Sequence, residues 1–206
     1  MLKARLKAAS GFTLIEMSVA LTIFGILVAA TLPTMRTWIM NAKVRATADA
    51  LQNGVRLAQA ESLRRSRQVV FALTNSSTPQ TGTFTATANG SYWAIMTIPA
   101  MTDGSEPAAF VEGGVLNATT SANVQITGPA GICFNSMGRL VANNSTGVSG
   151  VTCSAPTVGT PPKTVYQVTV PGSDHPLGLQ IEVALGGQVH MCDPSQTLSS
   201  TNPYGC

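Results

Sequence analysis

The chain has little charge and little of the chemistry that enzymes use. Charged residues make up 10% of its 206 residues, and histidine occurs only as His175 and His190. The sequence has no Gly-x-Ser-x-Gly elbow, no Walker loop for phosphate binding and no pair of carboxylates near a histidine. These absences argue against an enzyme, and we expect neither catalytic residues nor a cofactor.

Residues 71–206 are also poor in positive charge. They hold two bases, Arg139 and Lys163, against six acids, whereas residues 12–70 hold seven bases and three acids. Binding to nucleic-acid phosphates requires clustered lysine and arginine on an exposed surface. The basic cluster at Arg64, Arg65 and Arg67 lies where we expect a helix to end. Tight nucleic-acid binding by the C-terminal part is therefore not expected.

The sequence does contain a long apolar run. The 19 residues from Met17 to Met35 carry no charge and as a helix would span about 28 Å, close to the thickness of a bilayer's hydrocarbon region. Glu16 stands directly before this run. Inserting a carboxylate into a membrane-spanning helix costs on the order of 2.5–3.5 kcal/mol, so such a residue is a candidate for a functional role. Glu16 therefore requires a cation as its partner.

The residues before the run suggest where that cation comes from. Residues 1–10 carry Lys3, Arg5 and Lys7 and no acid, which predicts an N-terminus in the cytoplasm and export of the rest. Cleavage after Gly11 would create a new α-amine on Phe12, about one helical turn from Glu16. The alternative is an uncleaved signal-anchor helix whose Glu16 extends to the membrane interface.

The segment Gly11-Phe12-Thr13-Leu14-Ile15-Glu16, followed by an apolar helix, resembles the class III signal of type IV pilins and type II secretion pseudopilins. The resemblance implies that a prepilin peptidase cleaves between Gly11 and Phe12 and that Phe12 is N-methylated. It also implies that Glu16 pairs with the Phe12 amine of a neighbouring subunit. The apolar stretch would remain on the mature protein as a single span of the inner membrane, with a periplasmic head, until the subunit enters a filament.

The chain has four cysteines, Cys133, Cys153, Cys192 and Cys206. An even number of cysteines outside the cytoplasm indicates disulfide bonds. Of the three possible pairings we favour Cys133–Cys153 with Cys192–Cys206, because each bond closes a loop of modest length that is rich in Gly, Ser, Thr and Pro. Metal binding through His190, Cys192 and another pair is the alternative. The sequence has no Cys-x-x-Cys or His-x-x-x-His spacing, so we expect no metal.

Helical periodicity continues beyond the apolar run. Pro33 removes one helical hydrogen bond and is expected to kink the helix rather than end it. Apolar residues then recur at helical spacing along one narrow stripe, namely Val44, Ala48, Leu51, Val55 and Ala58. After a cleaved leader, residues 1–11, we expect a transmembrane or filament-core half, residues 12–35, and an amphipathic half, residues 36–68.

Residues 69–206 are expected to form a β-rich head. Gly, Ser, Thr, Asn and Pro are frequent after residue 74, which is typical of strands joined by long polar loops. The runs with the composition of strands are Val69–Leu73, Tyr92–Ile98, Val124–Thr127, Ile132–Phe134, Val165–Val170, Leu179–Leu185 and Gln188–Met191. The expected fold is α+β, with the head packed on the C-terminal half of one long helix.

Three stretches resemble the GspH/FimT group of minor pilins. They are Ala58-Gln59-Ala60-Glu61-Ser62-Leu63-Arg64-Arg65 before a Val-rich strand, Ile132-Cys133-Phe134-Asn135 with Gly138-Arg139, and Val189-His190-Met191-Cys192. Gln59 and Ser62 replace residues that are commoner in the group. The resemblance implies the pilin fold, in which one long N-terminal helix packs on an antiparallel β-rich head.

The sequence therefore predicts a minor type IV pilus subunit that acts in pilus assembly, in priming or in a tip complex. A minor pseudopilin of type II secretion is the runner-up, and a DNA-uptake pilin is third. The expected partners are other pilins, the prepilin peptidase and the inner-membrane assembly platform. The expected mechanism is the transfer of the apolar helix from lipid into a helical bundle.

Overall fold

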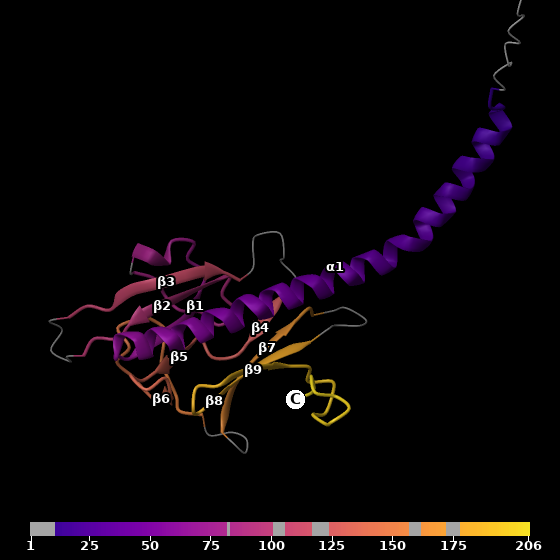
Figure 1. The fold of residues 1–206 in the computed structure, drawn as a ribbon. Coiled ribbons are helices and arrows are strands. Elements are labelled where there is room, and N and C mark those ends of the chain that lie inside the picture. Colours follow the sequence, from indigo (N-terminus) through magenta and orange to yellow (C-terminus); the bar gives the residue numbers. More distant parts are fainter. Residues whose placement is uncertain (1–10, 82, 101–105, 117–123, 157–161, 172–177) are drawn as a thin grey trace, which may run out of the picture. The chain divides into compact units, whose positions relative to one another are not determined.

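The computed structural model describes residues 11–81, 83–100, 106–116, 124–156, 162–171 and 178–206, and only the backbone of residues 32–34 (Figure 1). The chain divides into two compact units, Met1–Ile39 and Met40–Cys206. The leader up to residue 10 and His175 lie outside the described residues.

Helix α1 runs from Leu14 to Arg65. It continues through Pro33 rather than ending there, and a kink at this residue remains a prediction. The stripe expected to be buried is buried: Val44, Ala48, Leu51, Val55 and Ala58 are each at most 1% exposed. The helix ends at Arg65, where the left-handed backbone of Ser66 (φ 51°) interrupts the helical geometry.

Two antiparallel sheets follow α1, with the strand orders β3-β2-β1-β5-β6 and β4-β7-β8-β9. Together with helix α1 they confirm the α+β class. The strands are β1 (Val69–Thr74), β2 (Tyr92–Thr97), β3 (Ala109–Val115), β4 (Gln125–Thr127), β5 (Gly131–Phe134), β6 (Leu140–Val141), β7 (Lys163–Thr169), β8 (Leu179–Ala184) and β9 (Val189–Cys192), and a short 3-10 helix, η1, covers Pro79–Thr81.

The seven runs expected to form strands do so, with boundaries shifted by one or two residues, but β3 and β6 were not predicted from the sequence. Strand β3 contains Gly113 and Gly114, which have low strand propensity, and it lies at the edge of its sheet. Strand β6 has only two residues, too few to show periodicity.

One hydrophobic core joins α1 to both sheets. It contains the buried stripe of α1, alternate residues of β1 such as Phe71, and Tyr166 and Ile181 from the four-stranded sheet. All six residues of β1 are buried, because its other face packs into a second apolar cluster with Met96, Val148 and Cys153. Burial on both faces explains why β1 reads as a continuous apolar run rather than an alternating one.

Trp93 shows how closely the helix and the five-stranded sheet approach each other. Its ring stacks on Phe71 at a centroid distance of 5.9 Å. A Cβ atom on Gly54 of α1 would lie 2.9 Å from the Phe71 ring and 3.1 Å from Trp93, and one on Gly114 would lie 2.7 Å from Trp93 Nε1. Both glycines are therefore needed to accommodate this aromatic pair between α1 and β3.

Leu51 and Leu57 provide a matched test of this packing. Leu51 is fully buried in the core, whereas Leu57 of the same helix is 36% exposed. Leu51→Ala is expected to lower the free energy of unfolding of the head by about 2–5 kcal/mol, and Leu57→Ala by less than about 1 kcal/mol. Denaturant unfolding of the full chain in detergent measures both, and equal losses would contradict the packing described.

Candidate functional site

The start of α1 is an N-capped helix end. Thr13 Oγ1 accepts a hydrogen bond from the Glu16 N–H at 3.3 Å, and the Thr13 carbonyl accepts one from the Met17 N–H at 3.2 Å. This cap places the Glu16 carboxylate in the first helical turn, where the helix dipole favours negative charge. The cap was not predicted from the sequence, although Thr-x-x-Glu before an apolar run is the pattern of a capping box.

Glu16 and Phe12 are both open to solvent in the isolated chain. Phe12 is 80% exposed, and the Glu16 carboxylate has no hydrogen bond or ion pair with any described residue. Phe12 precedes the first residue of the helix, Leu14, and Glu16 lies in its first turn. The pairing of Glu16 with the Phe12 amine of a neighbouring subunit remains a prediction.

The first half of α1 buries almost nothing within the chain. The large apolar side chains described in this half are 39% to 88% exposed; they include Leu14 (88%), Phe24 (66%) and Val28 (39%). α1 is the helix, among the described residues, that is long and apolar enough to cross a membrane. Apolar surface of this extent is found on soluble proteins only where a partner or a membrane covers it.

Two of the three stretches that resemble the GspH/FimT group contact each other directly, and residues beside the first and third stretches join the third to them. Gln59 Nε2 of α1 donates a hydrogen bond to the Gly138 carbonyl at 3.1 Å, and Arg56 Nη2 donates one to the Val189 carbonyl at 3.1 Å. A Cβ atom on Gly187 (φ 92°) would lie 1.9 Å from the Gly138 oxygen. The helix, the turn after β5 and the turn before β9 therefore meet at one junction, which holds α1 against both sheets.

Both disulfide bonds are formed in the sequence-local pairing. Cys133 of β5 bonds to Cys153, with a Cα–Cα distance of 5.7 Å, and Cys192 of β9 bonds to Cys206, at 5.1 Å. The Cys206 N–H also donates to the Asp193 carbonyl at 3.2 Å. The second bond and this hydrogen bond fasten the C-terminal residues to the edge of the four-stranded sheet.

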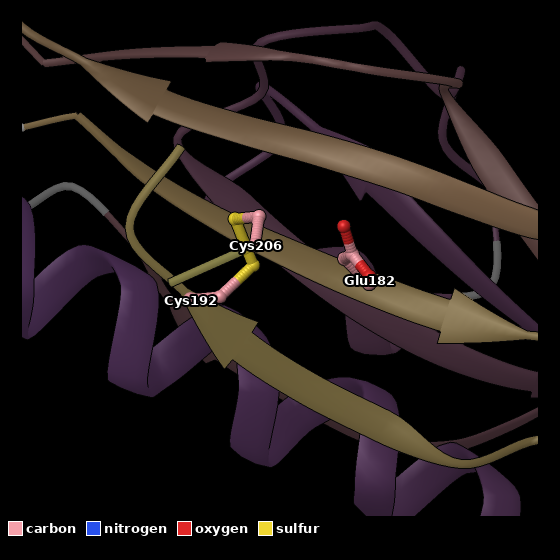
Figure 2. A group of neighbouring side chains, drawn as sticks. All are labelled: Glu182, Cys192 and Cys206. Carbon is pink, nitrogen blue, oxygen red and sulfur yellow. A yellow bond between two sulfur atoms is a disulfide. The ribbon is translucent and has the colours of Figure 1, made fainter. Parts of the chain in front are cut away.

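Glu182, Cys192 and Cys206 bring three potential metal-ligating atoms within 4.8 Å of one another (Figure 2). Zinc requires the thiolate form of cysteine, which these two residues cannot supply while they share a disulfide bond. The Glu182 carboxylate is also occupied, because it accepts hydrogen bonds from Lys163 at 2.5 Å and Gln180 at 2.7 Å. Glu182, Cys192 and Cys206 are therefore better described as a disulfide bond beside the Lys163–Glu182 ion pair than as a metal site.

The arginines at the end of α1 and directly after it are paired with carboxylates. Glu61 contacts Arg64 at 2.6 Å and Arg65 at 2.8 Å, which lowers its pKa through hydrogen bonds from both side chains, that of Arg64 first. Arg67 forms two hydrogen bonds of 2.5 Å with Glu106. These bonds, with a further one from the Ala100 N–H, lower the pKa of Glu106 to about 2. The three arginines of the basic cluster thus share two carboxylates, which leaves a net charge of one for the group.

The Arg67–Glu106 pair gives the head a pH-dependent stability. The pKa of Glu106 is lower in the folded head than in the unfolded chain, where it is about 4.3. The pair therefore stabilises the head above about pH 4.3, and this contribution is lost as the pH falls toward 2. We expect the stability difference between the wild-type chain and Glu106→Gln to shrink across this range in denaturant unfolding. Arg67→Gln should behave alike, and a difference independent of pH would contradict the pairing.

Comparison with known proteins identifies related chains. A family model of the prokaryotic N-terminal methylation motif matches residues 6–32, and a model of the type II transport protein GspH matches residues 47–173. Comparison with curated proteins gave no significant match.

Two solved structures are similar to the chain, and both are of the type IV minor pilin FimU of Pseudomonas aeruginosa (strain PAO1). One, in space group P65, is 13% identical with a TM-score of 0.45 and covers 74% of this chain and 94% of that chain. The other, in space group P21, is 12% identical with a TM-score of 0.47 and covers 75% and 92%.

The two family models describe complementary parts of one type of protein. The methylation motif covers Gly11, Phe12 and Glu16, and the GspH model covers more than half of the chain, from the buried part of α1 to the end of β7. The family is one of structural subunits rather than enzymes. The chain belongs to the family of the type II transport protein GspH and carries the N-terminal methylation motif, so it is a subunit of the pilin and pseudopilin kind, with an apolar N-terminal helix as its membrane anchor.

Proposed function

We propose that the chain is a minor subunit of a type IV pilus that acts in pilus assembly, in a priming or tip complex. The observation that carries the proposal is the exposed apolar half of α1, which begins with one acid, Glu16, that has no partner among the described residues. A helix of this kind is incomplete until other helices surround it. The subunit is therefore an assembly component rather than a binding module that works alone.

Assembly begins with processing of the N-terminus. The prepilin peptidase cleaves between Gly11 and Phe12 on the cytoplasmic face, and Phe12 is then N-methylated. The three bases of the leader hold the N-terminus in the cytoplasm, so the head lies in the periplasm. The membrane assembly platform then moves the helix from lipid into the helical bundle of the filament.

The transfer from lipid needs interactions other than the hydrophobic effect, because lipid chains are as apolar as the bundle. Dispersion packing between helices supplies part of the free energy. The charge pair between Glu16 and the Phe12 amine of an adjoining subunit fixes the axial register. An unpaired charge in this apolar setting would cost several kcal/mol, so registers that leave Glu16 unpaired are disfavoured.

A minor pseudopilin of type II secretion is the second candidate, and the match of residues 47–173 to the type II transport protein GspH favours it. Two disulfide bonds and long loops rich in Ser, Thr and Asn favour the pilus, because they suit a head exposed at a filament end. A DNA-uptake pilin is the third candidate. It is disfavoured by the pairing of the basic cluster and of Lys163 with carboxylates.

Deletion of the gene separates the first two candidates. We expect the deletion strain to lose surface pili, measured in the sheared fraction, while secretion of type II substrates into the medium is unchanged. The opposite result would assign the chain to type II secretion. A loss of DNA uptake with normal numbers of pili would favour the third candidate.

Complementation with variants of Glu16 tests the charge pair. Glu16→Leu and Glu16→Gln leave the amine of the neighbour buried without a partner, at a cost of about 3–5 kcal/mol. We therefore expect at least about a tenfold loss of incorporation into fibres, measured by quantitative immunoblotting. Glu16→Asp keeps the charge and should retain more incorporation than either.

Mass spectrometry of the subunit purified from fibres completes this test. The expected N-terminal peptide begins at Phe12 and carries one added methyl group, and both disulfide bonds are expected to be intact. Full incorporation of Glu16→Leu, or functional subunits that retain residues 1–11, would disprove the assembly mechanism.

A further inference from the structure

Trp38 is a large aromatic residue of α1 whose side chain packs against little else in the chain. It is 72% exposed, and its neighbours Met35 and Ile39 are 59% and 41% exposed. Residues three and four positions apart lie on the same side of a helix, so these three side chains form one apolar surface. We call Met35, Trp38 and Ile39 the outer apolar patch. It extends the apolar surface of α1 by one turn beyond Met35, where the uncharged run ends.

The position of Trp38 along α1 matches the thickness of a bilayer. Trp38 follows Glu16 by 22 residues, which corresponds to about 33 Å of helix, slightly more than the roughly 30 Å of a hydrocarbon region. When Glu16 lies at one boundary of the hydrocarbon region, Trp38 therefore lies at the other. Phe24 falls about 12 Å from Glu16, well inside the span.

The chemistry around Trp38 fits the boundary rather than the hydrocarbon interior. The indole ring is apolar but carries an N–H donor, and tryptophan is enriched where lipid meets water. Arg36, two residues earlier, is exposed, and its guanidinium group can pair with lipid phosphates. Met40, two residues later, is already packed against the core of the head. The side chains of α1 thus change from exposed to packed against the head within one helical turn of Trp38.

We propose that Trp38, with Arg36, is an interfacial anchor that binds the lipid headgroup region on the side of the head. This inference rests on the membrane anchoring of α1 in the proposed function. The anchor fixes the depth of the helix before assembly, so that Glu16 is held at the opposite interface. The head then begins within about one helical turn of the membrane surface.

The test uses the fact that the chain has only two tryptophans, Trp38 and Trp93. Trp93→Phe leaves Trp38 as the sole indole, and Trp38→Phe leaves Trp93, which is 9% exposed in the head. Each full-length variant is reconstituted in phosphatidylcholine–phosphatidylglycerol vesicles that contain lipids brominated at different depths. Flotation of the vesicles first shows whether the chain is inserted.

We expect fluorescence quenching of Trp38 to be at least about twofold stronger with bromines near the headgroup than with bromines near the chain ends. Trp93 in the Trp38→Phe variant should be quenched by neither. A calibration variant that combines Trp93→Phe and Trp38→Phe with Phe24→Trp should show the reverse depth preference.

Three outcomes would overturn the anchor. Strongest quenching of Trp38 by deep bromines would place it inside the hydrocarbon region, and absence of quenching with water-like emission would place it outside the membrane. Quenching that appears only when the protein is diluted would show that the outer apolar patch is covered by a second copy of the chain. Failure of the wild-type chain to float with vesicles would instead contradict the membrane anchoring in the proposed function.

Discussion

The apolar half of α1 determines what this protein can be. Its large side chains are exposed along the segment that precedes the head, and the carboxylate of Glu16 has no partner among the described residues. Water is an unfavourable solvent for such a surface, and lipid is an unfavourable one for the unpaired acid. A bundle of similar helices that also supplies a cation would cover the apolar surface and pair with the acid. The capped start of the helix, with Thr13 at the N-cap, holds Glu16 in the first turn, where the proposed charge pair would form.

The second half of α1 serves a different purpose, because it is part of the head's own core. Its buried stripe packs against both sheets, and Gln59 and Arg56 bond to the turn after β5 and to β9. The disulfide bonds lie in the same sheets, one at β5 and one at the end of β9. Disulfides stabilise a fold mainly by restricting the unfolded chain, which fits the proposed location of the head outside the reducing compartment of the cell. The helix is thus joined firmly to the head that it carries into an assembly.

Local patterns were sufficient to predict the helix, its buried stripe and most strands, because each of these shows a period of its own in the sequence. The strand β3 was missed because Gly113 and Gly114 look like a turn, whereas in the structure Gly114 makes room for the ring of Trp93. The junction of Gln59, Gly138 and Gly187 and the pair of Arg67 with Glu106 join residues far apart in the chain. Such contacts leave no periodic signal, so the sequence could indicate only the stretches that take part. The cap at Thr13 did have a signal, the spacing Thr-x-x-Glu.

The central claim is that Glu16 contacts the α-amine of an adjoining subunit once the helix is assembled. A zero-length carbodiimide cross-linker tests it most directly, because it forms an amide bond only between a carboxylate and an amine in contact. Applied to assembled complexes that contain isotopically heavy and light copies, it should yield a peptide that links Glu16 to the N-terminal residue of another subunit, and Glu16→Gln should abolish this peptide. If lysine cross-links form in the same sample but Glu16 is never joined to an N-terminal amine, the account is wrong.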